Sequence, residues 1–200
     1  MSKPGFRKGR SGGSGAGRES VEGFISSSWF SQAQILSLMK IEFARSRRHG
    51  IPLGCVMLQV DRMSQLVDLY GAQLRNSVRE TLSQLVRDKT RGADMLGMVN
   101  EDRYLLMLPH TDLEQVRIVA TRVHVMFQEY EVTMDDRPLA LTLSVGFTAT
   151  GDQQAMFFDS LVGQAETALQ WAMQQGGDRV TSFGETQLMD GDQSSSPEQE

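Results

Sequence analysis

The chain has 200 residues, 40% of them hydrophobic, and a formal net charge of −5 at pH 7. This length predicts one domain with tails, and the acidic balance argues against duplex-DNA binding, which ordinarily needs a basic face. The single cysteine, Cys55, excludes a disulfide framework and a four-cysteine zinc site. There is no apolar run of about 18 residues and no N-terminal hydrophobic region, so we expect neither a transmembrane segment nor a signal peptide. A cytoplasmic protein is the expectation.

The two ends of the chain differ in composition from its middle. Residues 1–28 are basic and rich in glycine and serine, and residues 184–200 are polar and acidic. Neither segment has enough apolar surface to offset its chain entropy, so both are expected to be disordered. The basic tail is interpreted either as an inert linker or as a weak contact with an anionic partner or surface. The globular domain is expected to span residues 29–183.

In the first half of this domain, helical and strand-like patterns alternate. An amphipathic helix ending at Gly50 precedes a strand at 51–60, and a helix over about 64–88 is interrupted near Gly71. Two short apolar runs, at 95–99 and 104–108, flank the polar residues 100–103. This arrangement predicts a β-hairpin with an exposed turn.

The second half continues the alternation. Thr111 or Asp112 can cap the next helix, which is followed by a strand at 138–148, a helix at 157–175 and an edge strand at 179–183. The order predicts an α/β sandwich whose core is similar to a ferredoxin-like βαββαβ unit.

Five segments, taken in chain order, carry a family resemblance. They are EFARSRRHG, VDRMSQLVDLYGAQLRNSV, RGAD placed before NEDRY, YLLMLPHT, and the pair LTLSVGFT and ALQWAMQQGGDRV. Residues 29–183 thereby resemble a GGDEF domain, the bacterial diguanylate cyclase module. The resemblance implies a nucleotidyl-cyclase-like α+β fold with a mainly antiparallel central sheet. It also implies the family reaction, in which metal ions help to join two GTP molecules into cyclic di-GMP.

At the family's catalytic positions, however, the sequence departs from the pattern. Gln59 replaces a metal-binding aspartate, and Asp102 is the one acid kept in the signature loop, where Arg103 inverts the charge of the next position. The other altered positions are Val67 and Asn76 for guanine binding, Met173 and Gly177 for phosphate binding, and Asn100, Glu101 and Tyr104 in the loop. We therefore expect a degenerate domain with no cyclase activity, no metal and no cofactor. A surviving nucleotidyl transferase dependent on Asp61 and Asp102 is the least favoured alternative.

One family motif is retained. Arg91-Gly92-Ala93-Asp94 matches the RxxD inhibitory site, which in the family binds cyclic di-GMP. An arginine fork suits guanine or phosphate, and the aspartate can accept from the guanine N1–H. The resemblance adds Arg122 from the following helix, often supplied by a neighbouring copy. The alternative is a solvated ion pair between Arg91 and Asp94.

Together these observations favour a non-catalytic cyclic di-GMP receptor or regulatory domain. A ligand-linked homodimer and an unidentified protein partner would follow from that function. The alternative is a protein-interaction scaffold, a pseudo-enzyme that binds no nucleotide.

Overall fold

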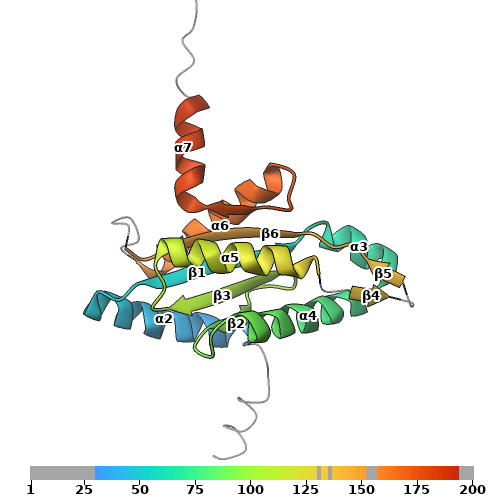
Figure 1. Ribbon diagram of the computed structural model, residues 1–200, viewed down its shortest axis with the longest axis horizontal. Coiled ribbons are helices and arrows are strands. Elements are labelled where there is room, and N and C mark those ends of the chain that lie inside the picture. Colours follow the sequence, from blue (N-terminus) through green and yellow to red (C-terminus); the bar gives the residue numbers. More distant parts are fainter. Residues whose placement is uncertain (1–29, 130–131, 135–136, 152–156, 194–200) are drawn as a thin grey trace, which may run out of the picture.

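The computed structural model describes residues 30–129, 132–134, 137–151 and 157–193 (Figure 1). The basic tail predicted over residues 1–28 lies outside the described residues, and so does Trp29. The central sheet has the strand order β2-β3-β1-β6-β7, and only the β6–β7 pair is parallel. Its strands are β1 (Leu53–Val60), β2 (Met95–Met98), β3 (Arg103–Pro109), β6 (Leu143–Ala149) and β7 (Val180–Ser182).

Helices cover both faces of this sheet (Figure 1). One face carries α2 (Gln32–His49) and α6 (Phe158–Gln174), and the other carries α4 (Gln73–Lys89) and α5 (Leu113–Phe127). The short helix α3 (Met63–Tyr70) precedes α4, and α7 (Phe183–Gln193) follows β7. With α4 between β1 and β2 and α5 between β3 and β6, the core is a βαββαβ unit. The predicted α+β fold with a mainly antiparallel sheet is confirmed.

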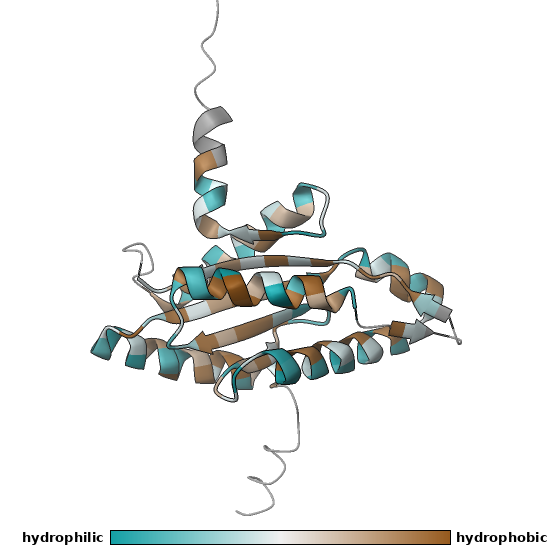
Figure 2. Cartoon of the chain, in the orientation of Figure 1, coloured by the Kyte–Doolittle hydropathy of each residue, from teal (hydrophilic) through white to brown (hydrophobic). Residues whose placement is uncertain are grey.

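Alternation along the strands divides the core into two layers. On β1, Val56 and Leu58 pack with α4 and α5, whereas Cys55 and Met57 pack with α2 and α6. Successive side chains of a strand point to opposite faces, so a central strand covered on both sides is apolar throughout. In Figure 2, hydrophobic residues colour much of the central strands and parts of the helices that pack against them.

Several predicted element ends are present for the predicted reasons. α2 ends at Gly50, whose φ of 65° is left-handed, and Gly71 with a φ of 87° separates α3 from α4. Asp112 caps α5 by accepting a hydrogen bond from the Gln115 amide at 2.9 Å. In the described part of the chain, no helix is long and apolar enough to cross a membrane.

Two predictions about the second half are wrong. The strand predicted at 138–148 is divided: Arg137–Leu139 forms β5, which pairs with β4 (Val132–Met134) as a separate hairpin, and β6 starts only at Leu143. Pro138 has no N–H to donate, which confines it to an edge strand rather than to the central sheet.

The predicted acidic tail begins as a helix rather than as a disordered segment. At the start of α7, the Glu185 amide donates to Ser182 Oγ at 3.3 Å, and the Ser182 amide donates to Glu185 Oε2 at 2.7 Å. This reciprocal pair is a capping box. Arg117 of α5 adds an ion pair to Glu185 at 2.9 Å. The hydropathy of the sequence predicts neither the capping box nor the ion pair.

Candidate functional site

The turn of the β2–β3 hairpin contains the residues that stand at the family's signature loop. Asn100 Oδ1 accepts hydrogen bonds from the backbone amides of Asp102 at 3.1 Å and Arg103 at 2.9 Å. An asparagine side chain thus closes the turn locally. The sheet register pairs Arg103 with Gln59 on the neighbouring strand β1. The hairpin end and the end of β1 therefore form one polar site.

Arg103 holds a central place in this site. Its Nε donates to Gln59 Oε1 at 2.9 Å, and its Nη1 pairs with Glu166 of α6. A guanidinium therefore joins β1, β3 and α6 through charge-assisted contacts. Glu166 was not singled out by the sequence, because it lies 63 positions from Arg103 and belongs to no motif.

The retained acid Asp102 is also bound to an arginine. Arg75 of α4 donates from Nε to Asp102 Oδ1 at 2.8 Å and lies 3.7 Å from Glu101. The hydrogen bond to Asp102 raises the pKa of Arg75. Only 21% of the Asp102 side chain is exposed, so the pair shields this carboxylate from solvent. The sequence does not predict Arg75 as a partner of Asp102.

These contacts do not fit a divalent cation. Mg²⁺ takes oxygen ligands in near-octahedral geometry, usually including carboxylates. Here Asp102 and Glu166 are each neutralised by an arginine, and Gln59 offers only an amide oxygen to Arg103. Within the described residues, no group of three or more histidine, cysteine, aspartate or glutamate side chains could hold a metal ion.

Asp61, the residue that follows β1, anchors the loop after α6. Its Oδ1 accepts from Ser144 Oγ at 2.6 Å, and its Oδ2 accepts from Thr142 Oγ1 at 2.7 Å and from the Asp178 amide at 2.9 Å. Gly177, with a φ of 77°, lies against this carboxylate, and a Cβ there would come within 2.8 Å of Asp61 Oδ1. The glycine therefore permits the close approach of the loop that follows α6.

The other altered positions are distributed over separate elements. Val67 of α3 and Met173 of α6 are partly buried and pack against opposite layers of the core. Asn76 Oδ1 accepts from Arg79 Nη1 at 3.3 Å. Tyr104 is buried on β3, and burial raises the pKa of its hydroxyl. The structure thus brings Gln59, Glu101, Asp102 and Arg103 together at the hairpin and leaves Val67 and Met173 in the two core layers.

The Arg91–Asp94 turn, which joins α4 to β2, forms a second polar site. The Arg91 amide donates to Asp94 Oδ2 at 2.8 Å, and the Asp94 amide donates to the Arg91 carbonyl at 2.9 Å. The carboxylate is thus bound by the Arg91 backbone rather than by its guanidinium. Both ends of the motif are fixed by the turn, while the Arg91 side chain is exposed.

A cavity of about 390 Å³ opens beside this turn, and Arg91, Asp94 and Arg122 all line it. Arg122 comes from α5 of the same chain, whereas the sequence left open its supply by a second copy. Burial raises the pKa of Asp94, and the Arg91 amide and the charges of Arg91 and Arg122 oppose this rise. The remaining lining residues are Asp88, Lys89, Thr90, Thr111, Gln115, Ile118 and Val119.

Thr111, Gln115 and Ile118 are among the lining residues that the sequence does not single out as part of a ligand site. The available signal was helical spacing, because Gln115, Ile118 and Arg122 follow one another at intervals of three and four on α5. Ile118 is 64% exposed and contributes apolar surface to the wall of the cavity. The cavity therefore combines cations, one part-desolvated carboxylate and an apolar wall.

Comparison with known proteins agrees with this architecture. Residues 30–179 match the family model described as diguanylate cyclase, GGDEF domain, and the chain belongs to this family. Diguanylate cyclase A of Treponema denticola is 26% identical over 130 residues, which cover 64% of this chain and 34% of that protein. Diguanylate cyclase DgcP of Pseudomonas aeruginosa is 26% identical over 149 residues, which cover 74% of this chain and 22% of that protein. The chain therefore spans about a third or less of these relatives.

Solved structures show the same fold. The diguanylate cyclase SiaD from Pseudomonas aeruginosa, in complex with its activator SiaC, superposes with a TM-score of 0.73 at 25% identity, covering 82% of this chain and 65% of SiaD. The GGDEF domain of DgcB from Caulobacter crescentus, in complex with c-di-GMP, gives a TM-score of 0.69 at 16% identity. That match covers 78% of this chain and 92% of the DgcB domain.

Proposed function

We propose that this GGDEF-family domain is a non-catalytic cyclic di-GMP receptor that binds its ligand at Arg91, Asp94 and Arg122. The observation that carries the proposal is the contrast between two sites. At the hairpin, Arg75 pairs with Asp102, the one acid kept in the signature loop, and Arg103, which stands at the next acidic position, pairs with Glu166. At the Arg91–Asp94 turn, arginines and a carboxylate line a cavity of about 390 Å³.

The absence of catalysis follows from electrostatics at the hairpin. Phosphoryl transfer from GTP needs metal ions to neutralise the charge that develops on the phosphates. Displacing Arg103 from Glu166 and Arg75 from Asp102 would break charge-assisted hydrogen bonds before any metal could bind. Gln59 would still contribute no negative charge. This site therefore supports no cyclase reaction.

Ligand binding follows from the chemistry of the cavity. Arg91 and Arg122 present planar forks that fit phosphate oxygens or the guanine O6 and N7 atoms. The Asp94 carboxylate, part-buried between these cations, can accept from the guanine N1–H and amino groups. The cavity volume lies near the lower end of the range of about 300–1,000 Å³ typical of small-molecule sites.

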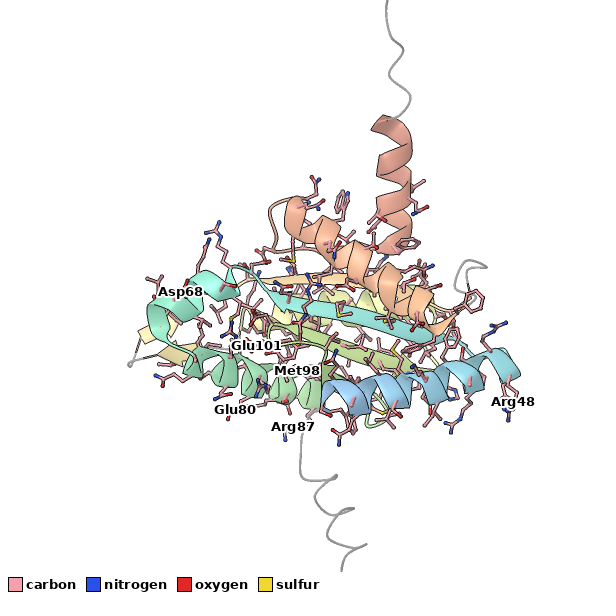
Figure 3. The ribbon with its side chains drawn as sticks, turned by 180° about the vertical axis from the view of Figure 1, so that it is seen from behind. Arg48, Asp68, Glu80, Arg87, Met98 and Glu101 are labelled. Atoms are coloured by element: carbon pink, nitrogen blue, oxygen red, sulfur yellow. The ribbon has the colours of Figure 1, made fainter. Side chains whose placement is uncertain are left out.

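Isothermal titration of the full chain with cyclic di-GMP tests the proposal. We expect micromolar or tighter binding, lost in Arg91→Ala and in Asp94→Ala. Arg48→Ala is the matched control, because Arg48 is an exposed arginine at the end of α2, well separated from Arg87 on α4 in Figure 3. No binding by the wild type would refute the receptor and favour a protein-interaction scaffold that binds no nucleotide.

Incubation with GTP and Mg²⁺ or Mn²⁺ tests the proposed absence of cyclase activity. We expect no cyclic di-GMP by chromatography. Product formed by the wild type and abolished in Asp102→Asn would instead identify a surviving nucleotidyl transferase. As a receptor, the chain would act in the bacterial cytoplasm and pass ligand occupancy to a protein partner or to a second copy of itself.

A further inference from the structure

A second cavity adjoins the Arg91–Asp94 turn. It has a volume of about 180 Å³ and shares Thr90, Arg91 and Asp94 with the larger cavity. Its remaining lining residues are Phe30, Val86, Arg87, Gly92, Met95 and Leu96. The two recognition residues of the turn therefore face two adjoining hollows rather than one.

Phe30 is the aromatic side chain of the smaller cavity, and its backbone is fixed against β2. The Phe30 amide donates to the Leu96 carbonyl at 2.8 Å, and the Met98 amide donates to the Phe30 carbonyl at 2.9 Å. Phe30 immediately precedes Ser31, the N-cap of α2. Because these hydrogen bonds already order the backbone of Phe30, a ligand contact with its ring would cost less conformational entropy than a contact with a mobile segment.

The charges around the two cavities match a dianion. Four cations line them, together with the carboxylates of Asp88 and Asp94. The cations are Arg87, Lys89, Arg91 and Arg122. This leaves a net positive site for a molecule with two phosphates. Purine bases stack on aromatic rings, and this stacking contributes measurably to binding.

We propose that one cyclic di-GMP straddles the Arg91–Asp94 turn, with one guanylate in the larger cavity beside Ile118 and the other base against Phe30. This inference rests on the proposed function and adds a contact residue and a stoichiometry of one ligand per chain. A base bound in the smaller cavity would also contact Phe30, the residue directly before the N-cap of α2.

The test is isothermal titration of the full chain with cyclic di-GMP. Phe30→Leu keeps apolar volume but removes the ring, and we expect about tenfold weaker binding. Phe30→Tyr keeps the ring and should bind within about twofold of the wild type. Phe157→Ala is the matched aromatic control, because the exposed Phe157 lines neither cavity and its removal should leave affinity unchanged.

The outcomes distinguish the straddled pose from the receptor function on which it rests. Wild-type binding that is lost in Arg91→Ala but unchanged in Phe30→Leu would overturn the straddled pose and leave the receptor intact. Two ligands per chain would do the same, since they would indicate a stacked pair beside one cavity. No binding by the wild type would overturn both proposals. Thermal unfolding of each variant verifies that it is folded.

Discussion

Arg103 on β3 donates a hydrogen bond from Nε to the Oε1 atom of Gln59 on β1 over 2.9 Å. The two residues face each other in the sheet register, at two positions where the GGDEF pattern has acidic side chains. The Arg103 guanidinium thereby adds a side-chain contact to the pairing of β3 with β1.

Reversing the charge at position 103 should destabilise the domain. Arg103→Glu would place a carboxylate beside Glu166 and remove the bond to Gln59, at an expected cost of about 1 kcal/mol in the free energy of unfolding. Urea denaturation followed by circular dichroism measures the change. The double variant Arg103→Glu with Glu166→Arg restores an opposite-charge pair and should recover much of the loss. Equal stability of the two variants would contradict the role assigned to the pair.

Gly146 on β6 sets the distance between the sheet and α6. A Cβ at this position would lie 2.0 Å from the Leu169 amide nitrogen and 2.4 Å from the Ala165 carbonyl oxygen. Because these backbone atoms cannot easily move aside, Gly146→Ala should lower the free energy of unfolding by about 3 kcal/mol or more. Gly163→Ala, on the exposed face of α6 with open space around it, should instead stabilise by about 0.5–1 kcal/mol. Urea denaturation of both variants compares these opposite effects.

The attachment of α7 should weaken in acid. Burial raises the pKa of Glu185, but hydrogen bonds from Ser182 and the ion pair with Arg117 outweigh it, so the net shift is downward. A carboxylate with a depressed folded-state pKa contributes stability above its ordinary pKa of about 4.3 and loses it as the pH falls through the folded value.

The comparison with Glu185→Gln isolates this contribution from that of other carboxylates. The wild type should be more stable than this variant at pH 7, and the difference should shrink as the pH falls below about 4.3. Hydrogen exchange in α7 measured across this pH range should report the same loss. A stability difference independent of pH would contradict the ion-pair account.

Ligand binding should also depend on pH, in a range set by Asp94. Burial raises the pKa of this carboxylate above its ordinary value, so it takes up a proton at a higher pH than an exposed aspartate would. The protonated form loses the charge that accepts from guanine N1–H, and affinity for cyclic di-GMP should fall as the solution is acidified. Titrations between pH 7.5 and 4.5 measure this fall. In Asp94→Asn, binding should be weak and nearly independent of pH.

Much of the fold could be predicted because its elements carry local signals. The stripe of Leu74, Val78 and Leu82 predicts α4, and the polar residues between two apolar runs predict the β2–β3 hairpin. The β4–β5 hairpin could not be separated from β6, because apolar residues run through both segments. The polar composition of residues 184–200 does not predict the start of α7, although Ser182 and Glu185 have capping-box spacing.

For the candidate sites, residue identity was easier to predict than pairing. The sequence places Gln59 and Arg103 at altered family positions and Asp102 at a retained one, but it does not reveal that Glu166 and Arg75 are the partners of Arg103 and Asp102. These contacts join elements far apart in the chain, and only the folded sheet brings them together. The order of the motif at Arg91 among the other segments makes it predictable, whereas the ligand contacts proposed for Ile118 and Phe30 depend on the two cavities of the folded domain.

The receptor function and the closed hairpin site are tested together by titrating the wild-type chain with cyclic di-GMP and, in parallel, with GTP plus Mg²⁺. We expect saturable micromolar binding of cyclic di-GMP that depends on Arg91, and no measurable binding of GTP with Mg²⁺. Binding of GTP that requires Mg²⁺, with none of cyclic di-GMP, would contradict both the closed hairpin site and the ligand site at the Arg91–Asp94 turn.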